Sequence, residues 1–166
     1  MNSFEDKLLP VELDILNKLT NIPLNVSAMT VVTNLHRAAQ KMRNKMEKEV
    51  LSQYRLSWTA FSLLYNLWIW EKMDARELAE SMGVTVATVS SVTNTLERKN
   101  LCYRETNKQD RRLVFLSLTE KGKKMIEELY PKFNQGETEI VAGLSEAEQE
   151  VLTQLLRRVI RNMTVE

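Results

Sequence analysis

Apolar residues recur along this chain mainly at the three- and four-residue spacing of a helix. The clearest run lies between residues 26 and 51, where these apolar residues share one helical face: Val32, Leu35, Ala39, Met42, Met46 and Val50. The same spacing is found in a weaker segment at residues 4–20 and in a final helix that we expect to end near Met163. The pattern therefore predicts a mainly helical protein.

Capping and turn residues divide the middle of the chain into separate helices. Asp74 and Glu77 have the spacing of a capping box, in which each side chain accepts a hydrogen bond from the other residue's backbone. Gly83 interrupts the helical pattern, and Thr85 can cap the helix that follows it. We expect these helices at residues 58–70, 75–82 and 86–99. Asn100 can then adopt the left-handed conformation at the end of the last helix.

Two short apolar runs next predict a β-hairpin, and more helices follow it. The strands are expected at residues 101–106 and 113–118. Thr119 can cap a long helix over residues 120–141, in which Pro131 is expected to cause a kink or a break. Ser145 and Glu148 have the spacing of a second capping box, which predicts the start of the final helix.

Three residues of the central region have the spacing of a helix-turn-helix. Ala79, Gly83 and Val89 occupy relative positions 0, 4 and 10. Such a motif needs a small residue where the helices cross and a glycine where the turn takes a positive φ. It also needs a branched apolar residue where the second helix faces the first. Because capped helices surround this spacing, it predicts a helix-turn-helix.

The second helix of this motif has an apolar and a polar face. Val89, Val92 and Leu96 are expected to point inward. The outer surface is small and polar, so it can enter a major groove and offer hydroxyl and amide groups to base edges. We expect DNA contacts from Thr85, Ala87, Thr88, Ser90, Ser91, Asn94, Thr95 and Arg98. A solvated helix face is the alternative, and the basic hairpin that follows favours DNA.

The tip of the hairpin carries Asp110, Arg111 and Arg112. An arginine at such a tip can enter the narrow minor groove, where the negative potential is concentrated. Asp110 and Arg112 have the same side-chain parity on a strand, so the aspartate can orient that guanidinium. We expect Arg112 in the minor groove and Arg111 at a phosphate. The alternative is a polar tip with a weak surface ion pair.

Charge is distributed unevenly, although the net charge of the 166 residues is only +1. Residues 98–124 hold nine basic and three acidic residues, which is the local footprint expected of a nucleic-acid partner. The single cysteine, Cys102, excludes an intrachain disulfide and fits a reducing cytosol. No uncharged apolar run approaches the roughly 18 to 20 residues of a membrane span. We expect a cytoplasmic protein without a membrane partner.

Several short motifs of the central region occur together in one protein family. They are ELAESMGVT at 77–85, ATVS at 87–90, LERK at 96–99, DRR at 110–112 and LSLTEKG at 116–122. With them the chain resembles the MarR family of winged helix-turn-helix transcriptional regulators. The resemblance implies a mainly α fold: a winged helix-turn-helix with a two-stranded β-wing and N- and C-terminal dimerisation helices.

The resemblance also implies a homodimer that binds double-stranded DNA. Residues 1–56 and 120–166 would supply dimerisation helices, and residues 57–119 the DNA-binding domain. Each subunit would place its recognition helix in the major groove and its wing in the minor groove. The operator would be a pseudo-palindrome with half-sites roughly 10 bp apart. Repression is the default for the family, a small-molecule effector is common, and no cofactor is expected.

Four further residues are candidates for binding a ligand. Trp58, Phe61 and Tyr65 lie at helical spacing, which is more often a feature of a core than of a pocket. They also correspond to the place where effectors of the resembled family bind. His36, the single histidine, is more simply structural, with ligand contact as the second interpretation.

The remaining function classes have less support in the sequence. One histidine and one cysteine far apart form no nucleophile–base pair, and no glycine-rich phosphate loop is present, so an enzyme is not expected. No set of metal ligands is evident. Cys102 is most simply a small buried residue, although Lys99 and Arg104 could lower its pKa and make it a redox sensor. A cysteine-based redox regulator and a protein-interaction module without operator binding stay as alternatives.

Overall fold

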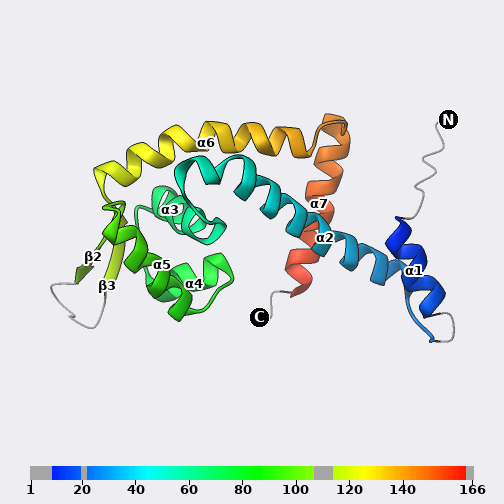
Figure 1. The fold of residues 1–166 in the computed structure, drawn as a ribbon. Helices are drawn as coiled ribbons and strands as arrows, with labels where there is room; N and C mark the ends of the chain where they lie inside the picture. Colours follow the sequence, from blue (N-terminus) through cyan, green and yellow to red (C-terminus); the bar gives the residue numbers. More distant parts are fainter. Residues whose placement is uncertain (1–8, 20–21, 107–113, 164–166) are drawn as a thin grey trace. The chain divides into compact units, whose positions relative to one another are not determined.

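The structure is a computed structural model that describes residues 9–19, 22–106 and 114–163 (Figure 1). It divides into two compact units, residues 1–42 and residues 43–166. In the parts of the chain that it describes, no helix is long and apolar enough to cross a bilayer. The same parts contain no group of three or more His, Cys, Asp or Glu residues that could hold a metal ion.

The N-terminal unit contains α1 (Pro10–Lys18) and most of α2 (Val26–Glu49). A buried carboxylate connects them: Glu12 is only 7% exposed. Its Oε2 accepts a hydrogen bond from the Leu9 backbone N–H at 2.6 Å, and its Oε1 accepts one from Asn34 Nδ2 at 2.7 Å. Since a buried carboxylate is costly unless its oxygens are hydrogen-bonded, both contacts offset the burial of Glu12. The bond from Leu9 lies at the start of α1, and the bond from Asn34 joins α1 to α2.

The C-terminal unit begins with the last residues of α2 and holds the remaining elements. They are η1 (Leu51–Tyr54), α3 (Trp58–Trp70), β1 (Lys72–Asp74), α4 (Ala75–Met82), α5 (Val86–Arg98), β2 (Cys102–Thr106), β3 (Val114–Leu118), α6 (Glu120–Ile140) and α7 (Glu146–Met163). The predicted caps are confirmed: Thr119 Oγ1 accepts from Gly122 N at 3.0 Å, and the Ser145 N–H donates to Glu148 Oε2 at 2.7 Å. The helical order predicted from the sequence is therefore correct.

The sheet has three antiparallel strands in the order β1-β3-β2. The hairpin of β2 and β3 was predicted, whereas β1 was not. In the register, Met73 lies opposite Leu116, and Cys102 lies opposite Leu118. β1 has only three residues, too few for an alternating pattern, and its strand conformation depends on pairing with β3, which is distant in sequence.

Helix α3 occupies the centre of the C-terminal unit and packs against α4, α5, α6 and β3. The side chains with at most 2% exposure include Leu63, Leu64, Leu67, Leu78, Val89, Leu96, Leu116, Ile126 and Leu129. Burying one such side chain stabilises the fold by about 1.5–3 kcal/mol. One continuous core thus joins the helix-turn-helix, the sheet and the first half of α6.

Two expectations about the long helices need correction. Helix α6 is continuous through Pro131, so the expected break does not occur. The proline removes a single N–H and is exposed, while the flanking Leu129 and Phe133 are buried and hold the helix to the core. The apolar face predicted on α2 is buried only near its end, at Met46 and Val50, whereas Val32 is 63% exposed.

Candidate DNA-binding surface and ligand pocket

The helix-turn-helix consists of α4 and α5, and α4 begins with the predicted capping box. Asp74 Oδ1 accepts hydrogen bonds from the Arg76 and Glu77 backbone N–H groups at 2.7 and 3.0 Å. Glu77 Oε2 in turn accepts one from the Asp74 N–H at 2.7 Å. Because these bonds satisfy N–H groups that a helix otherwise leaves unpaired, they define where α4 starts.

The turn between the helices has the geometry that its three marker residues predicted. Gly83 has a φ of +62°, a conformation that favours glycine. Its N–H and that of Val84 bond back to carbonyls of α4, including Val84 N to Ala79 O at 2.9 Å. Ala79 and Val89 are 6% and 0% exposed. The spacing therefore marked a true helix-turn-helix.

Helix α5 presents the predicted polar residues outward. Thr85, Ala87, Ser90, Ser91, Asn94, Thr95 and Arg98 are exposed, and Thr88 is half-buried. Thr85 Oγ1 accepts the Thr88 N–H at 3.1 Å, and the two hydroxyls are 2.9 Å apart. The Thr88 hydroxyl thus belongs to the cap of the helix as well as to its surface.

The inward face of α5 differs from the prediction at one position. Val89 and Leu96 are buried as expected, but Val92 is only half-buried, and Thr93 is fully buried beside it. The Thr93 hydroxyl donates to the Val89 carbonyl at 2.8 Å, which removes the cost of burying it. Because a threonine can satisfy its hydroxyl within its own helix, Thr93 can lie in the core although the sequence analysis did not assign it to the inward face.

Arg98 lies at the end of α5 with its guanidinium folded along the helix. Its Nε donates to the Asn94 carbonyl at 3.2 Å, and one terminal nitrogen lies 3.3 Å from Thr95 Oγ1. These bonds are exposed and made to neutral acceptors, so the charge of Arg98 is not compensated by them. The same three residues, Asn94, Thr95 and Arg98, therefore form one polar group on the outer face.

Several basic residues of segment 98–124 form contacts within the fold. Arg104 forms an ion pair with Glu97 and also lies 3.5 Å from the Ser90 carbonyl, which ties β2 to α5. Lys99 Nζ donates to the Arg55 carbonyl, and Lys121 Nζ donates to the Lys99 carbonyl, each at 2.9 Å. The count of basic residues in the sequence therefore overstates the number that are free to meet a partner.

The wing is described only along its two strands. The predicted tip residues Asp110, Arg111 and Arg112 lie outside the described residues. At the base of the wing, Thr119 donates to the Asn100 carbonyl at 2.7 Å, and Asn100 has the predicted left-handed conformation with a φ of +55°. The ends of α5, β3 and α6 are thus joined at one point.

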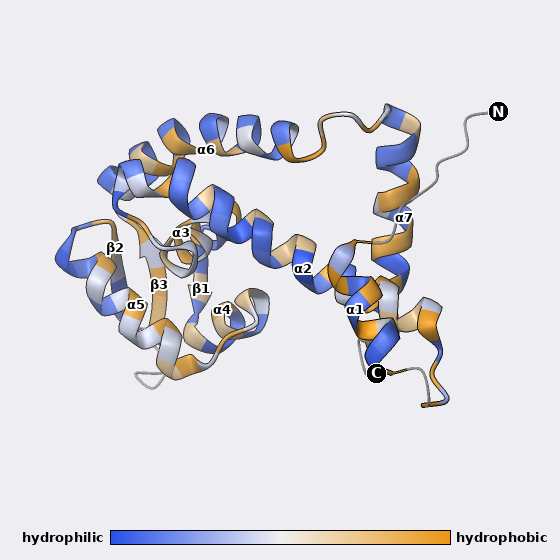
Figure 2. Cartoon of the chain, turned by 45° about the vertical axis from the view of Figure 1, so that its right-hand side comes forward, coloured by the Kyte–Doolittle hydropathy of each residue, from blue (hydrophilic) through white to orange (hydrophobic). Residues whose placement is uncertain are grey.

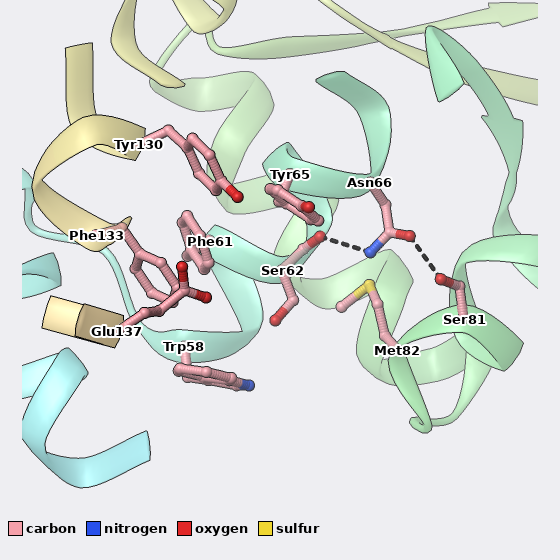
Figure 3. A pocket seen from close by; sticks show the side chains of 10 residues that line it. All are labelled: Trp58, Phe61, Ser62, Tyr65, Asn66, Ser81, Met82, Tyr130, Phe133 and Glu137. Atoms are coloured by element: carbon pink, nitrogen blue, oxygen red, sulfur yellow. Dashed lines mark hydrogen bonds between the residues drawn. The ribbon is translucent and has the colours of Figure 1, made fainter. Parts of the chain in front are cut away.

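An aromatic pocket of about 350 Å³ opens among α3, α4 and α6 (Figure 3). The candidates Trp58, Phe61 and Tyr65 line it together with Tyr130 and Phe133 of α6. Its remaining lining residues are Ser62, Asn66, Ser81, Met82 and Glu137. Pockets of roughly 300–1,000 Å³ suit small ligands, so its volume suits a ligand with one or two rings.

The rings of the pocket form a connected stack. Phe61 and Phe133 have centroids 4.2 Å apart, and Tyr65 and Tyr130 have centroids 5.5 Å apart. Burial, followed by hydrogen bonding with the Tyr65 hydroxyl, raises the pKa of Tyr130 above its usual value. The phenol of Tyr130 therefore stays neutral at physiological pH.

His36 is exposed on α2 and is not among the residues that line this pocket. The sequence had not indicated Tyr130, Phe133 or Glu137, although they follow one another at helical spacing on α6. That spacing on one helix is the signal in the sequence that could have indicated them.

Cys102 lies at the start of β2 and is 2% exposed. Burial, aided by Glu97, raises the pKa of its thiol to about 12. Arg104 acts in the opposite direction but is the smaller influence. Because redox sensors need an accessible thiolate, this environment opposes the redox alternative.

Two comparisons decide which family this fold represents. Residues 56–114 match the MarR family. Over 155 residues, or 92% of the chain, it is 52% identical to YwaE, an uncharacterized HTH-type transcriptional regulator of Bacillus subtilis, and the match covers 91% of that protein. The chain belongs to the MarR family. It is a winged helix-turn-helix transcriptional regulator, and these names indicate a regulator and not an enzyme.

Solved structures of MarR-type regulators share the fold. BpsR of Bordetella bronchiseptica is 26% identical over 78% of this chain and 97% of its own, with a TM-score of 0.71. Its structure concerns regulation of DNA binding by 6-hydroxynicotinic acid. MepR of S. aureus, solved as a complex with DNA, is 26% identical over 80% of this chain and 97% of its own, with a TM-score of 0.72.

Proposed function

We propose that this MarR-family chain acts as a homodimer that binds a pseudo-palindromic DNA operator and represses transcription. Helix α5 of each subunit enters the major groove, and Arg112 of each wing enters the minor groove. Residues 57–119 form the DNA-binding domain, and residues 1–56 and 120–166 provide dimerisation. Repression follows because a dimer that covers a promoter blocks polymerase.

The observation that carries this proposal is the outer face of α5. It is exposed, small and polar, and it stands on a capped helix that the core holds rigidly through Val89 and Leu96. A face without bulky side chains can approach base edges closely, and its hydroxyl and amide groups can both donate and accept hydrogen bonds. The DNA complex of MepR, which is 26% identical to this chain, supports the same use of the fold.

The face of α5 carries little charge, so affinity must come from its borders. Among the described residues, Arg98 stands at its end, and Lys123 and Lys124 are exposed near the start of α6. Phosphate contacts from such residues position a protein on DNA, whereas base contacts give specificity. We assign Arg111 to a phosphate and Asp110 to the orientation of Arg112.

A second copy of the chain is the partner that the terminal helices require. Helix α7 has no buried residue, and it exposes Val151, Leu152, Leu155, Ile160 and Met163. Apolar residues form bands along this helix in Figure 2. In the N-terminal unit, Val31 and Val32 of α2 are likewise more than half exposed. An isolated amphipathic helix is only marginally stable in water, so this surface needs an apolar partner.

The proposal is tested by titrating the purified protein on DNA from upstream of its own gene and on scrambled DNA. Each titration is made at two salt concentrations, with wild type, Arg112→Ala and the matched control Arg43→Ala on α2. We expect specific binding that weakens with salt. The logarithm of the association constant should fall with the logarithm of the salt concentration, with a slope of about −0.9 per neutralised phosphate. Arg112→Ala should weaken it further, and Arg43→Ala should leave it unchanged.

Other results would point to the alternatives. Binding that is equal on scrambled DNA would mean that only the electrostatic contacts operate. Failure to bind this and other genomic DNA, with the dimer intact, would favour a protein-interaction module. A cysteine-based redox regulator would be supported if mild oxidation abolishes DNA binding by the wild type and a reductant restores it. The Cys102→Ala variant should then keep its DNA binding on oxidation.

A further inference from the structure

The aromatic pocket has walls suited to a flat or rounded apolar group. Five of its lining residues are aromatic, and their rings come from α3 on one side and α6 on the other. Trp58 completes the group, with its ring centroid 6.2 Å from that of Phe61 and 6.0 Å from that of Phe133 (Figure 3). The faces of aromatic rings carry negative potential, so such a wall attracts a cation more strongly than a neutral group.

Glu137 is the charged residue among the described residues that line the pocket, and these include no lysine, arginine or histidine. Its Oε2 accepts a hydrogen bond from the neutral Asn134 side chain at 2.9 Å. Among the described residues, no ion pair to Glu137 is formed, whereas Glu139 on the same helix pairs with Lys45 at 3.3 Å. The carboxylate of Glu137 is therefore available to a positively charged ligand.

Several polar groups at this pocket are already engaged in hydrogen bonds within the protein. At the start of α3, the backbone N–H of Trp58 donates to Glu47 Oε1 at 3.0 Å, and the backbone N–H of Ala60 donates to the Ser57 hydroxyl at 3.2 Å. The amide of Asn66 donates to the Ser62 carbonyl at 2.8 Å and accepts the Ser81 hydroxyl at 2.5 Å. A carboxylate ligand would thus meet Glu137 without a compensating positive charge, which is unfavourable.

We propose that this pocket binds a small organic cation, an ammonium group that carries an aromatic or bulky apolar substituent. The cationic group lies against the faces of Trp58 and Phe61 and beside the Glu137 carboxylate, while the apolar substituent occupies the space between α3 and α6. The inference rests on the proposed function, because it names the chemical class of the effector of that regulator. Met82 also lines the pocket, so the ligand contacts the end of α4, next to the turn of the helix-turn-helix.

The test measures binding to the full, DNA-free protein by isothermal titration calorimetry. The probes are benzyltrimethylammonium and phenylacetate, which share a benzyl group and carry opposite charges. We expect benzyltrimethylammonium to bind and phenylacetate to bind more weakly or not at all. Tighter binding of phenylacetate, or no binding of the cation at millimolar concentration, would overturn the proposal.

Matched variants show whether binding occurs in this pocket. Glu137→Gln removes the charge but keeps an oxygen for Asn134, and we expect it to weaken cation binding about three- to tenfold. Glu139→Gln is its control, because Glu139 lines a different surface and pairs with Lys45. Equal affinity of wild type and Glu137→Gln would contradict the assignment.

A second pair of variants tests the aromatic wall. Trp58→Leu should also weaken binding, whereas Trp70→Leu should not, because Trp70 lies on the same helix but is 65% exposed and does not line the pocket. Circular dichroism would establish that all variants are folded. Equal losses in the two tryptophan variants would contradict the proposed site.

This experiment can fail independently of the operator experiment. Cation binding to a protein that binds no DNA would leave the pocket assignment correct and the regulator proposal wrong. Operator binding by a protein that ignores the cation would leave the regulator correct and the ligand class wrong.

Discussion

Gly122 shows how a single residue connects the wing to the helix after it. A Cβ atom at this position would lie 1.9 Å from the Leu101 carbonyl oxygen, far inside van der Waals contact. That carbonyl accepts the Thr119 N–H at 3.1 Å, so Leu101 and the start of α6 cannot move apart without breaking this hydrogen bond. The glycine of the Leu-Thr-x-x-Gly motif is thus explained by a close approach of two backbones.

Gly122→Ala should destabilise the protein by about 1–3 kcal/mol, the usual cost of forcing extra atoms into a packed site. Lys124→Ala, at an exposed position two residues further along α6, is the control and should change the free energy of unfolding little. Urea unfolding followed by circular dichroism measures both. Equal stability of Gly122→Ala and wild type would mean that α6 can shift away from Leu101.

The buried thiol of Cys102 gives the protein a specific pH dependence. Its pKa is raised from its ordinary value of 9.0 to about 12 in the folded state. As the pH rises through this window, the unfolded thiol loses its proton while the folded thiol keeps it, so stability falls. Below pH 9 both states are protonated, and this contribution to stability is fully present.

Cys102→Ala should therefore lose less stability than wild type between neutral pH and about pH 10.5. Lysines and tyrosines also titrate there, but they are common to both proteins, so the difference between them reports on Cys102. Urea unfolding at the two pH values measures it. An identical loss in the two proteins would show that the thiol is not protected by burial.

At the scale of elements, α5 depends on its cap for its exact start. Thr85 is exposed, yet its hydroxyl binds both the backbone and the side chain of Thr88. The same hydroxyl lies on the surface that we propose for DNA. Stability and DNA affinity must therefore be measured separately at this residue.

Thr85→Ala should cost about 0.5–2 kcal/mol of stability in the absence of DNA, because it leaves an N–H of the first turn without an acceptor. Thr85→Ser keeps the hydroxyl and should stay within a few tenths of a kcal/mol of wild type. Thermal unfolding of DNA-free protein compares them. If both variants are equally destabilised, the threonine methyl group, and not the capping hydrogen bond, contributes the stability at this position.

At the scale of the whole molecule, the main question is what covers α7. Its apolar side chains repeat every three to four residues, but none of them is buried in this chain. A helix with such a pattern normally lies on a core. The proposed homodimer supplies that core from a second copy.

Leu155→Glu should weaken the dimer by at least tenfold in its dissociation constant, since a charge would be buried at the interface. Leu155 is 50% exposed within the chain, so the subunit itself should stay folded. Gln154→Glu adds the same charge at the neighbouring position and should leave the dimer intact. Sedimentation velocity measures both, and a Leu155→Glu protein that stays dimeric would remove α7 from the interface.

Much of the fold could be read from local chemistry. The caps at Asp74, Thr85 and Thr119 and the turn at Gly83 depend on residues within a few positions of one another. Their hydrogen bonds can therefore be predicted from residue types at fixed short spacings. The exposed face of α5 followed from helical periodicity for the same reason.

Features that depend on distant contacts were missed or misplaced. Strand β1 exists because Met73 pairs with Leu116, and Thr93 is fully buried in the core although its side chain is polar. Pro131 suggested a break in α6, but the burial of Leu129 and Phe133 on either side keeps the helix continuous. In each case packing against the rest of the molecule outweighed the local preference.

The sequence by itself determined the order of the long helices and the β-hairpin, the helix-turn-helix and its polar face, because helix periods, caps and turns act over a few residues. Only the tertiary structure decided which basic residues are already engaged, that Cys102 is shielded, and that α3 and α6 bring aromatic rings together around Glu137. Those properties depend on distances between segments far apart in the chain, and such distances are set by packing.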